Sequence, residues 1–170
     1  MAAVFPGVDL QGEMNDPGRL SLEVDSGFNT FHQTEFAGLL VVPTCQRSEM
    51  DLVQMGEKVE DEKDRLLRRF MAFAKEVCSV LQLEGHWADY IDPCSGLPMI
   101  NRSSGSVYDE VEALSTLRGF KTQNAGCCKI LLHPKWQSCI YPATLFTKAP
   151  LAVLQAAIGE AEKALMSFTD

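Results

Sequence analysis

The feature that most constrains the fold of this chain is a long amphipathic pattern over residues 57–83. Acidic residues open the segment, which suits the positive end of a helix dipole. Apolar residues then recur every three or four positions, the spacing that places them on one helical face. This stripe consists of Leu66, Phe70, Phe73 or Ala74, Val77 and Leu81. The sequence therefore predicts one long helix, with Gly85 suited to end it.

Short strand-like runs fill much of the remaining chain. Alternating or β-branched apolar segments predict strands at 20–24, 38–42, 87–91, 97–100, 128–132 and 139–146. We expect Pro43 to end the second run and Pro142 to place part of the last one at an edge or a bulge. A helix is predicted over 150–168, and 107–117 is an ambiguous segment with helical character. Short hairpins with separate helices favour an α+β fold with a largely antiparallel sheet.

The size and charge of the chain limit its number of domains and its kinds of binding partner. Its 170 residues, 46% of them hydrophobic, fit one domain with an adequate core. We expect residues 1–20 to form an extended arm and residues 21–170 to form a single domain. The formal net charge of −8 repels phosphate backbones and anionic lipids, which argues against nucleic acid and membranes as partners.

The first residues do not resemble a targeting signal. Asp9, Glu13 and Asp16 stand against Arg19, whereas a mitochondrial transit peptide is rich in Arg and poor in acids. No run approaches the roughly 18 apolar residues of a membrane span. We therefore expect a cytoplasmic address, and most of the six cysteines should be free thiols.

The segment Gly126-Cys127-Cys128-Lys129 is the best candidate to carry chemistry. If it lies on a strand, neighbouring side chains point to opposite faces. We then expect Cys128, Ile130 and Leu132 on the core face, and Cys127, Lys129, Leu131 and His133 on the more polar face. Cys127 is therefore the predicted exposed thiol.

Its neighbours would make that thiol reactive. Lys129 lies on the same predicted face, and a nearby cation favours the thiolate. Gly126 has no side chain, so a bulky ligand could approach the backbone closely. A thiolate is a soft donor that suits transition-metal centres. The competing interpretation is that both cysteines only fill the core, as free cysteines commonly do.

Other arrangements have less support. A zinc site would draw on Cys127, Cys128, His133 and Cys139, but there is no Cys-x-x-Cys spacing. A Cys127–His133 couple would span about 20 Å along a strand. A disulfide between adjacent cysteines is disfavoured, because their Cα atoms lie only about 3.8 Å apart.

A carboxylate pair for acid–base catalysis is also disfavoured. Asp92 precedes Pro93 and is expected to form a turn. Asp89 is expected at an exposed strand position and has the opposite strand parity. The two carboxylates would therefore face different sides.

Taken together, several motifs resemble the cobalamin-trafficking protein of the cblD family (methylmalonic aciduria and homocystinuria type D). They are Lys75-Glu76-Val77-Cys78, Glu84-Gly85-His86-Trp87-Ala88-Asp89-Tyr90-Ile91-Asp92-Pro93, Ser95-Gly96-Leu97, Gly119-Phe120 and Gly126-Cys127-Cys128-Lys129. The resemblance covers about residues 39–149. It is specific because the Trp-Ala-Asp segment and the Gly-Cys-Cys-Lys segment occur together.

The resemblance implies a fold like that of the flavin nitroreductases, without flavin and without enzymatic activity. It implies an adapter that receives cobalamin (vitamin B12) from a cblC-type processing protein. The adapter would direct the cobalamin towards methionine synthase or methylmalonyl-CoA mutase. By the same resemblance Cys127 is the cobalt ligand in a thiolato-cobalamin complex, with Gly126, Cys128 and Lys129 around it. The family's mitochondrial forms have a long leader that this sequence does not show, and a mitochondrial form stays open.

The residues also allow two other functions. The first is a thiol-dependent redox enzyme with Cys127 as nucleophile and Cys128 or Cys139 as the resolving thiol. The second is an interaction module whose cysteines all serve packing.

Overall fold

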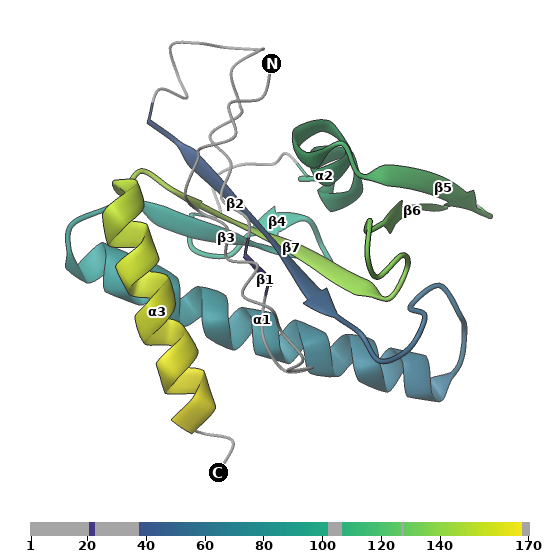
Figure 1. The fold of residues 1–170 in the computed structure, drawn as a ribbon. Helices are drawn as coiled ribbons and strands as arrows, with labels where there is room; N and C mark the ends of the chain where they lie inside the picture. Colours follow the sequence, from purple (N-terminus) through teal and green to yellow (C-terminus); the bar gives the residue numbers. More distant parts are fainter. Residues whose placement is uncertain (1–20, 23–37, 102–106, 127, 168–170) are drawn as a thin grey trace.

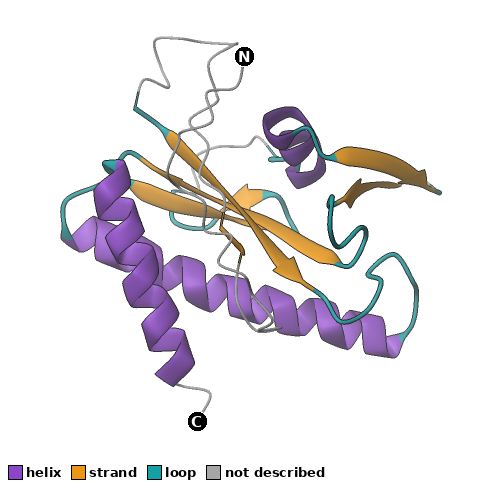
Figure 2. Cartoon of the chain, viewed as in Figure 1, coloured by secondary structure: helices purple, strands orange, loops and turns teal. Residues whose placement is uncertain are grey.

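The computed structural model describes residues 21–22, 38–101, 107–126 and 128–167, which form two antiparallel sheets and three helices (Figures 1 and 2). The five-stranded sheet runs, in spatial order, through β1 (Ser21–Leu22), β2 (Leu40–Arg47), β7 (Ile140–Thr147), β3 (Ala88–Asp92) and β4 (Leu97–Pro98). A separate hairpin contains β5 (Lys121–Ala125) and β6 (Cys128–Leu132). The helices are α1 (Glu57–Leu83), α2 (Glu110–Arg118) and α3 (Leu151–Ser167).

These elements confirm the predicted α+β class with antiparallel strands. The likeness to flavin nitroreductases and the extent of the single domain stay predictions. The predicted arm over residues 1–20 lies outside the described residues.

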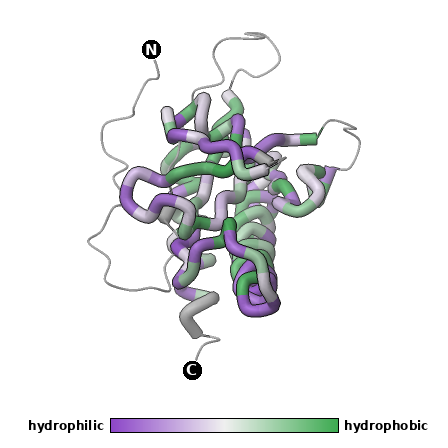
Figure 3. Tube along the Cα trace, turned by 90° about the vertical axis from the view of Figure 1, so that its right-hand side faces the viewer, coloured by the Kyte–Doolittle hydropathy of each residue, from purple (hydrophilic) through white to green (hydrophobic). Residues whose placement is uncertain are grey.

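Helix α1 begins and ends where the sequence predicts. Gly85 follows its C-terminal end with a φ of 83°, a left-handed conformation that glycine adopts without strain. Helices α1 and α3 pack on the same face of the main sheet (Figure 1). Apolar stretches run through the interior of the molecule where the helices and strands meet (Figure 3). This core includes Phe70, Phe73, Val77 and Leu81 of α1, Val42, Tyr90 and Leu145 of the sheet, and Leu154 and Ile158 of α3.

The opposite face of the sheet carries a second, smaller core. It joins Cys45 of β2, Leu114 of α2, Phe120, Leu131 of β6 and Ile140 of β7. The β5–β6 hairpin extends from this region away from the main sheet (Figure 1). Because alternate residues of a strand point to opposite faces, β7 contributes to both cores.

Two prolines behave differently from each other. Pro43 does not end β2, contrary to prediction; it lies inside the strand, opposite Thr144 of β7. The described pairing of β2 with β1 involves only Thr44 and Cys45, so Pro43 has no described partner on β1. Pro142 lies in β7 before the segment that pairs with β3. That half of β7 pairs only with β2 among the described strands, which confirms the predicted edge position.

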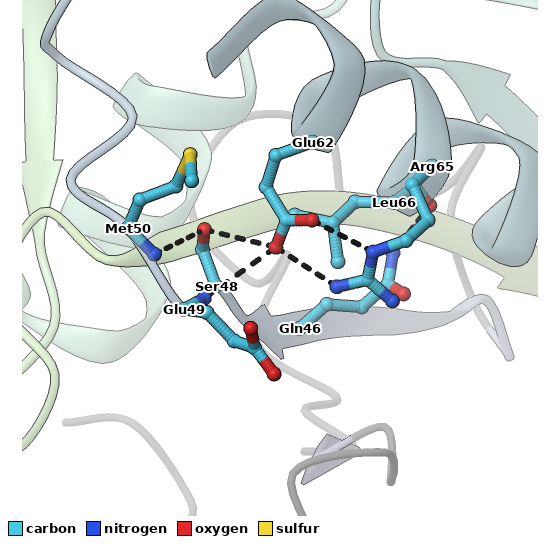
Figure 4. A network of polar contacts seen from close by, with 7 residues as sticks. All are labelled: Gln46, Ser48, Glu49, Met50, Glu62, Arg65 and Leu66. Atoms are coloured by element: carbon cyan, nitrogen blue, oxygen red, sulfur yellow. Dashed lines mark hydrogen bonds and ion pairs between the residues drawn. The ribbon is translucent and has the colours of Figure 1, made fainter. Parts of the chain in front are cut away.

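A polar network joins the end of β2 to the first turns of α1 (Figure 4). The Glu62 carboxylate accepts hydrogen bonds from the Ser48 hydroxyl, the Glu49 N–H and the Arg65 guanidinium. The hydrogen bond from Arg65 is the main cause that lowers the pKa of Glu62. Deeper in the molecule, the Gln46 side-chain amide donates to the Leu66 carbonyl at 2.8 Å. These contacts fix the loop that leads from the sheet into α1.

Asp89 is buried, with 2% of its surface exposed, and the prediction of an exposed position is wrong. Its Oδ1 accepts the N–H groups of Tyr90 (2.8 Å) and Ile100 (2.9 Å). Its Oδ2 accepts the N–H and the side-chain amide of Asn101. The carboxylate therefore satisfies three backbone donors and holds the chain that follows β4 against β3. Asp92 forms the predicted turn by accepting from Cys94 N and Ser95 Oγ.

We predict that Asp89→Ala lowers the free energy of unfolding by about 3 kcal/mol or more, because it leaves three backbone N–H groups without their acceptor. Urea denaturation measures this change. Asp92→Ala serves as the control, since its turn is exposed to water, and should cost about 1 kcal/mol or less. Equal losses in the two variants would contradict the structural role given to Asp89.

Candidate functional site

The predicted site segment lies at the end of the β5–β6 hairpin. Ala125 pairs with Cys128, so only Gly126 and Cys127 separate the last paired residues. Gly126 has a φ of 64° and is exposed, and a Cβ added to it would meet no atom within 4 Å. The left-handed backbone explains the glycine, and the open space permits close approach of a ligand. Cys127 lies outside the described residues, as does the side chain of Cys128.

The predicted faces of β6 are reversed along most of the strand. Leu131 is buried at 5% exposure and belongs to the second core, whereas Ile130 and Leu132 are half-buried. The side of β6 that carries Leu131 packs under α2 and β7. Strand parity therefore does not support the prediction that Cys127 is exposed. What remains is that Lys129, at the start of β6, is exposed.

The residues that follow β6 anchor the hairpin. His133 is buried, stacks on Trp136 with ring centroids 4.4 Å apart, and meets the edge of Phe120 at 5.2 Å. Its Nδ1 accepts the N–H groups of Lys135 and Trp136. Burial, followed by the charge of Lys135, lowers the pKa of His133. The ring is thus a neutral part of a tight turn.

This geometry weakens the two alternatives that need His133. One imidazole nitrogen is already occupied by backbone donors, and the ring is held between aromatic side chains. Within the part of the chain that the structure describes, no group of three or more His, Cys, Asp or Glu side chains could hold a metal ion. The cysteines of the zinc hypothesis fall partly outside that part.

The other thiols differ in access. Cys45 and Cys78 are buried, Cys94 is exposed and Cys139 is half-buried, and these four form no disulfide among the described residues. Burial, helped by the charge of Asp89, raises the pKa of Cys78 to about 12. Cys45 and Cys78 are therefore packing residues, as predicted. Cys94, in the turn between β3 and β4, offers a matched exposed thiol for comparison with Cys127.

A small open cavity of about 210 Å³ lies against β6 and β7. Its walls are mainly apolar and include Val111, Ile130 and Ile140. Two cationic side chains also line it, Lys63 from α1 and Lys129 from β6. Pockets for drug-sized ligands measure about 300–1,000 Å³, so this cavity suits a group smaller than a whole cofactor. Sequence patterns alone do not reveal this cavity, because its walls come from five separate segments.

A buried carboxyl group lies on the same side of the sheet. Glu110, the first residue of α2, accepts a hydrogen bond from the Thr144 hydroxyl through Oε2. Its Oε1 is buried and has no hydrogen-bond partner among the described residues. Burial raises the pKa of Glu110 to about 7, against the opposing effect of Thr144. Nearby, the Tyr108 ring meets Phe146 edge-on at 5.2 Å. No sequence pattern marks Glu110 as a functional residue, because only the fold brings it against Thr144.

We predict that Glu110 makes stability fall as the pH rises. Its pKa in the folded state, about 7, exceeds the ordinary value of 4.5. The unfolded chain therefore ionises first, and the stabilisation present below pH 4.5 is lost progressively up to about pH 7. Glu110→Gln should flatten this part of a plot of unfolding free energy against pH. Glu112→Gln, at an exposed site on the same helix, should leave the slope unchanged; an unaltered slope in Glu110→Gln would contradict the assignment.

No helix in the described residues is long and apolar enough to cross a membrane.

A family model and several curated proteins that resemble this chain point to the same family. The family model described as "Methylmalonic aciduria and homocystinuria type D protein" matches residues 20–157. The "Cobalamin trafficking protein CblD" of Rattus norvegicus is 34% identical over 119 residues, which are 70% of this chain and 40% of the rat protein. The Homo sapiens protein of the same name is 34% identical over 111 residues, 65% of this chain and 38% of the human protein.

This chain thus spans about two fifths of the length of the curated relatives it matches. The match includes all three helices at least in part, all described strands and the Gly126–Lys129 segment. We conclude that the chain belongs to the methylmalonic aciduria and homocystinuria type D protein family.

Proposed function

We propose that this chain is an intracellular cobalamin-trafficking adapter that binds cobalt through the thiolate of Cys127. It receives cobalamin from a cblC-type processing protein and passes it towards methionine synthase or methylmalonyl-CoA mutase. The adapter is not an enzyme, acts in the cytoplasm and uses no flavin. The observation that carries the proposal is membership of a family whose relatives are named cobalamin trafficking proteins, together with a cysteine pair at a hairpin end.

The described neighbours of Cys127 suit a ligand to a large complex. Gly126 is exposed and has open space where a side chain would stand. Covalent geometry limits the Cα atoms of Cys127 and Lys129 to about 7 Å apart. Lys129 is exposed, and a cation at this range favours the thiolate over the thiol. A thiolate is in turn the kind of soft donor that binds a transition-metal centre.

An adapter role also agrees with the size of the described cavity. At about 210 Å³, it falls below the usual range of cavities for drug-sized ligands, and a corrin ring is larger than such ligands. This cavity therefore does not enclose a whole cobalamin. A partner protein would cover the rest of the ligand, and the complex would depend on both proteins.

The alternative is a thiol-dependent redox enzyme that uses Cys127 as nucleophile. It would require a resolving thiol, for which Cys128 and the half-buried Cys139 are candidates. Such an enzyme would turn over small thiols and peroxides in the absence of cobalamin. The adapter would not.

We predict that Cys127→Ser abolishes a thiolato-cobalamin absorption spectrum while the fold persists. The measurement is an absorption titration of this protein into a mixture of cobalamin and the cblC-type partner. The wild type should produce the new spectrum because the thiolate donates to cobalt. Serine keeps the size of the side chain but replaces the soft donor.

Cys94→Ser is the matched control, because Cys94 is the exposed thiol among the four described ones. It should leave the spectrum unchanged. A spectrum that survives Cys127→Ser and disappears in Cys94→Ser would move the cobalt ligand to Cys94. Survival in both variants would exclude either thiol as the ligand.

A further inference from the structure

We propose that the cavity beside β6 binds the nucleotide tail of cobalamin, its phosphate at the two lysines and its benzimidazole base against the apolar wall. This inference rests on the proposed function, because it concerns the same ligand. It adds a second contact site, distinct from the thiolate, on residues of this chain. It also assigns a role to Lys63, which belongs to α1 and was not predicted to take part in binding.

The cavity has the right composition for such a group. Its apolar wall includes Val111, Ile130 and Ile140, which suits a flat aromatic base. No carboxylate is found among the described residues that line it, although the whole chain carries a formal net charge of −8. Two lysines from different elements therefore make a local cationic site on an acidic protein. That combination of one anion site and one apolar wall fits a phosphate joined to an aromatic base.

The two lysines contribute differently. Lys129 is exposed, and among the described residues its ammonium takes part in no ion pair or hydrogen bond. Lys63 forms an ion pair with Glu60 at 2.9 Å, and the Glu60 side chain is 65% exposed. Exposed pairs of this kind are weak, so Lys63 can turn to a phosphate at little cost. Lys129 is expected to supply the larger part of the attraction.

The position of the cavity also agrees with a cobalt ligand at Cys127. Lys129 lines the cavity and is two residues from Cys127, about 7 Å at most between Cα atoms. A ligand held at cobalt by Cys127 would therefore be within reach of Lys129. The cavity, at about 210 Å³, is too small for the corrin ring but large enough for a bicyclic base.

Binding of the base in the cavity requires it to leave cobalt. The cobalt–nitrogen bond to the base breaks with its electron pair retained on the ring nitrogen. The Cys127 thiolate supplies the electron pair of the new cobalt–sulfur bond. This is an exchange of ligands with no change in the oxidation state of cobalt, so no oxidant or reductant is needed.

The first test avoids cobalt altogether. The dimethylbenzimidazole ribonucleotide, the isolated tail with its phosphate, is titrated into the full chain labelled with nitrogen-15. We expect saturable amide shifts at Val111, Ile130 and Ser138, which line the cavity. Lys129→Met should weaken binding about tenfold, which corresponds to about 1.4 kcal/mol. Lys63→Met should weaken it less.

Lys121→Met is the control, because it removes the same charge from an exposed position of the same hairpin that does not line the cavity. It should leave the affinity unchanged. Inorganic phosphate, titrated alone, should bind much more weakly than the ribonucleotide. Equal shifts with phosphate, or equal losses in Lys121→Met and Lys129→Met, would overturn the proposal in favour of a general anion effect.

The second test separates the cavity from the thiolate. Cobinamide has the same corrin ring but no nucleotide tail, and it is compared with cobalamin in the presence of the cblC-type partner. We expect the Cys127-dependent spectrum to form with both, with cobinamide bound about tenfold more weakly. Equal affinities, together with no ribonucleotide binding, would refute the cavity proposal and leave the thiolate intact. Ribonucleotide binding without any Cys127-dependent spectrum would refute the thiolate and keep the cavity.

Discussion

Strand β7 pairs with β2 along its eight residues and with β3 over its last three, and both of its faces are covered. Ala143 and Leu145 belong to the core under α1 and α3, whereas Ile140 belongs to the core with α2 and the hairpin. Among the described strands, β5 and β6 pair only with each other, so the attachment of this hairpin depends on side-chain packing around Ile140 and Leu131. This packing fixes the base of the hairpin and leaves its other end accessible.

That division explains where chemistry can occur on this protein. The base of the hairpin is held by the buried ring of His133, which stacks on Trp136 and accepts hydrogen bonds from backbone N–H groups. The opposite end carries the exposed Gly126 and Lys129, which flank the cysteine pair in the chain. A ligand atom on such an end can be presented to a second protein, while the hairpin base keeps its direction. The arrangement thus agrees with the proposed transfer of cobalamin between proteins.

Much of the fold could be predicted from local pattern. The apolar stripe of α1 is long and regular. The acidic residues at its start and Gly85 after its last turn marked the two ends of the helix. Strand β5 was missed because Lys121–Ala125 is almost wholly polar and has no buried residue; only its pairing with β6 makes it a strand. The faces of β6 were reversed because its burial is decided by Ile140 and α2, which lie elsewhere in the sequence. Asp89 and Glu110 escaped prediction for the same reason, since tertiary contacts bury them.

The candidate segment 126–129 could be predicted from its residue types and from the family resemblance. The cavity beside it could not, because only the fold brings its lining residues together.

X-ray absorption at the cobalt edge can show whether a sulfur atom of this chain binds cobalt. The sample is the complex of this chain, cobalamin and the cblC-type partner, prepared once with wild type and once with Cys127 replaced by selenocysteine. We expect a sulfur neighbour of cobalt in the first sample and a selenium neighbour in the second, because residue 127 supplies the ligand. A first shell of nitrogen and oxygen alone, in both samples, would contradict it.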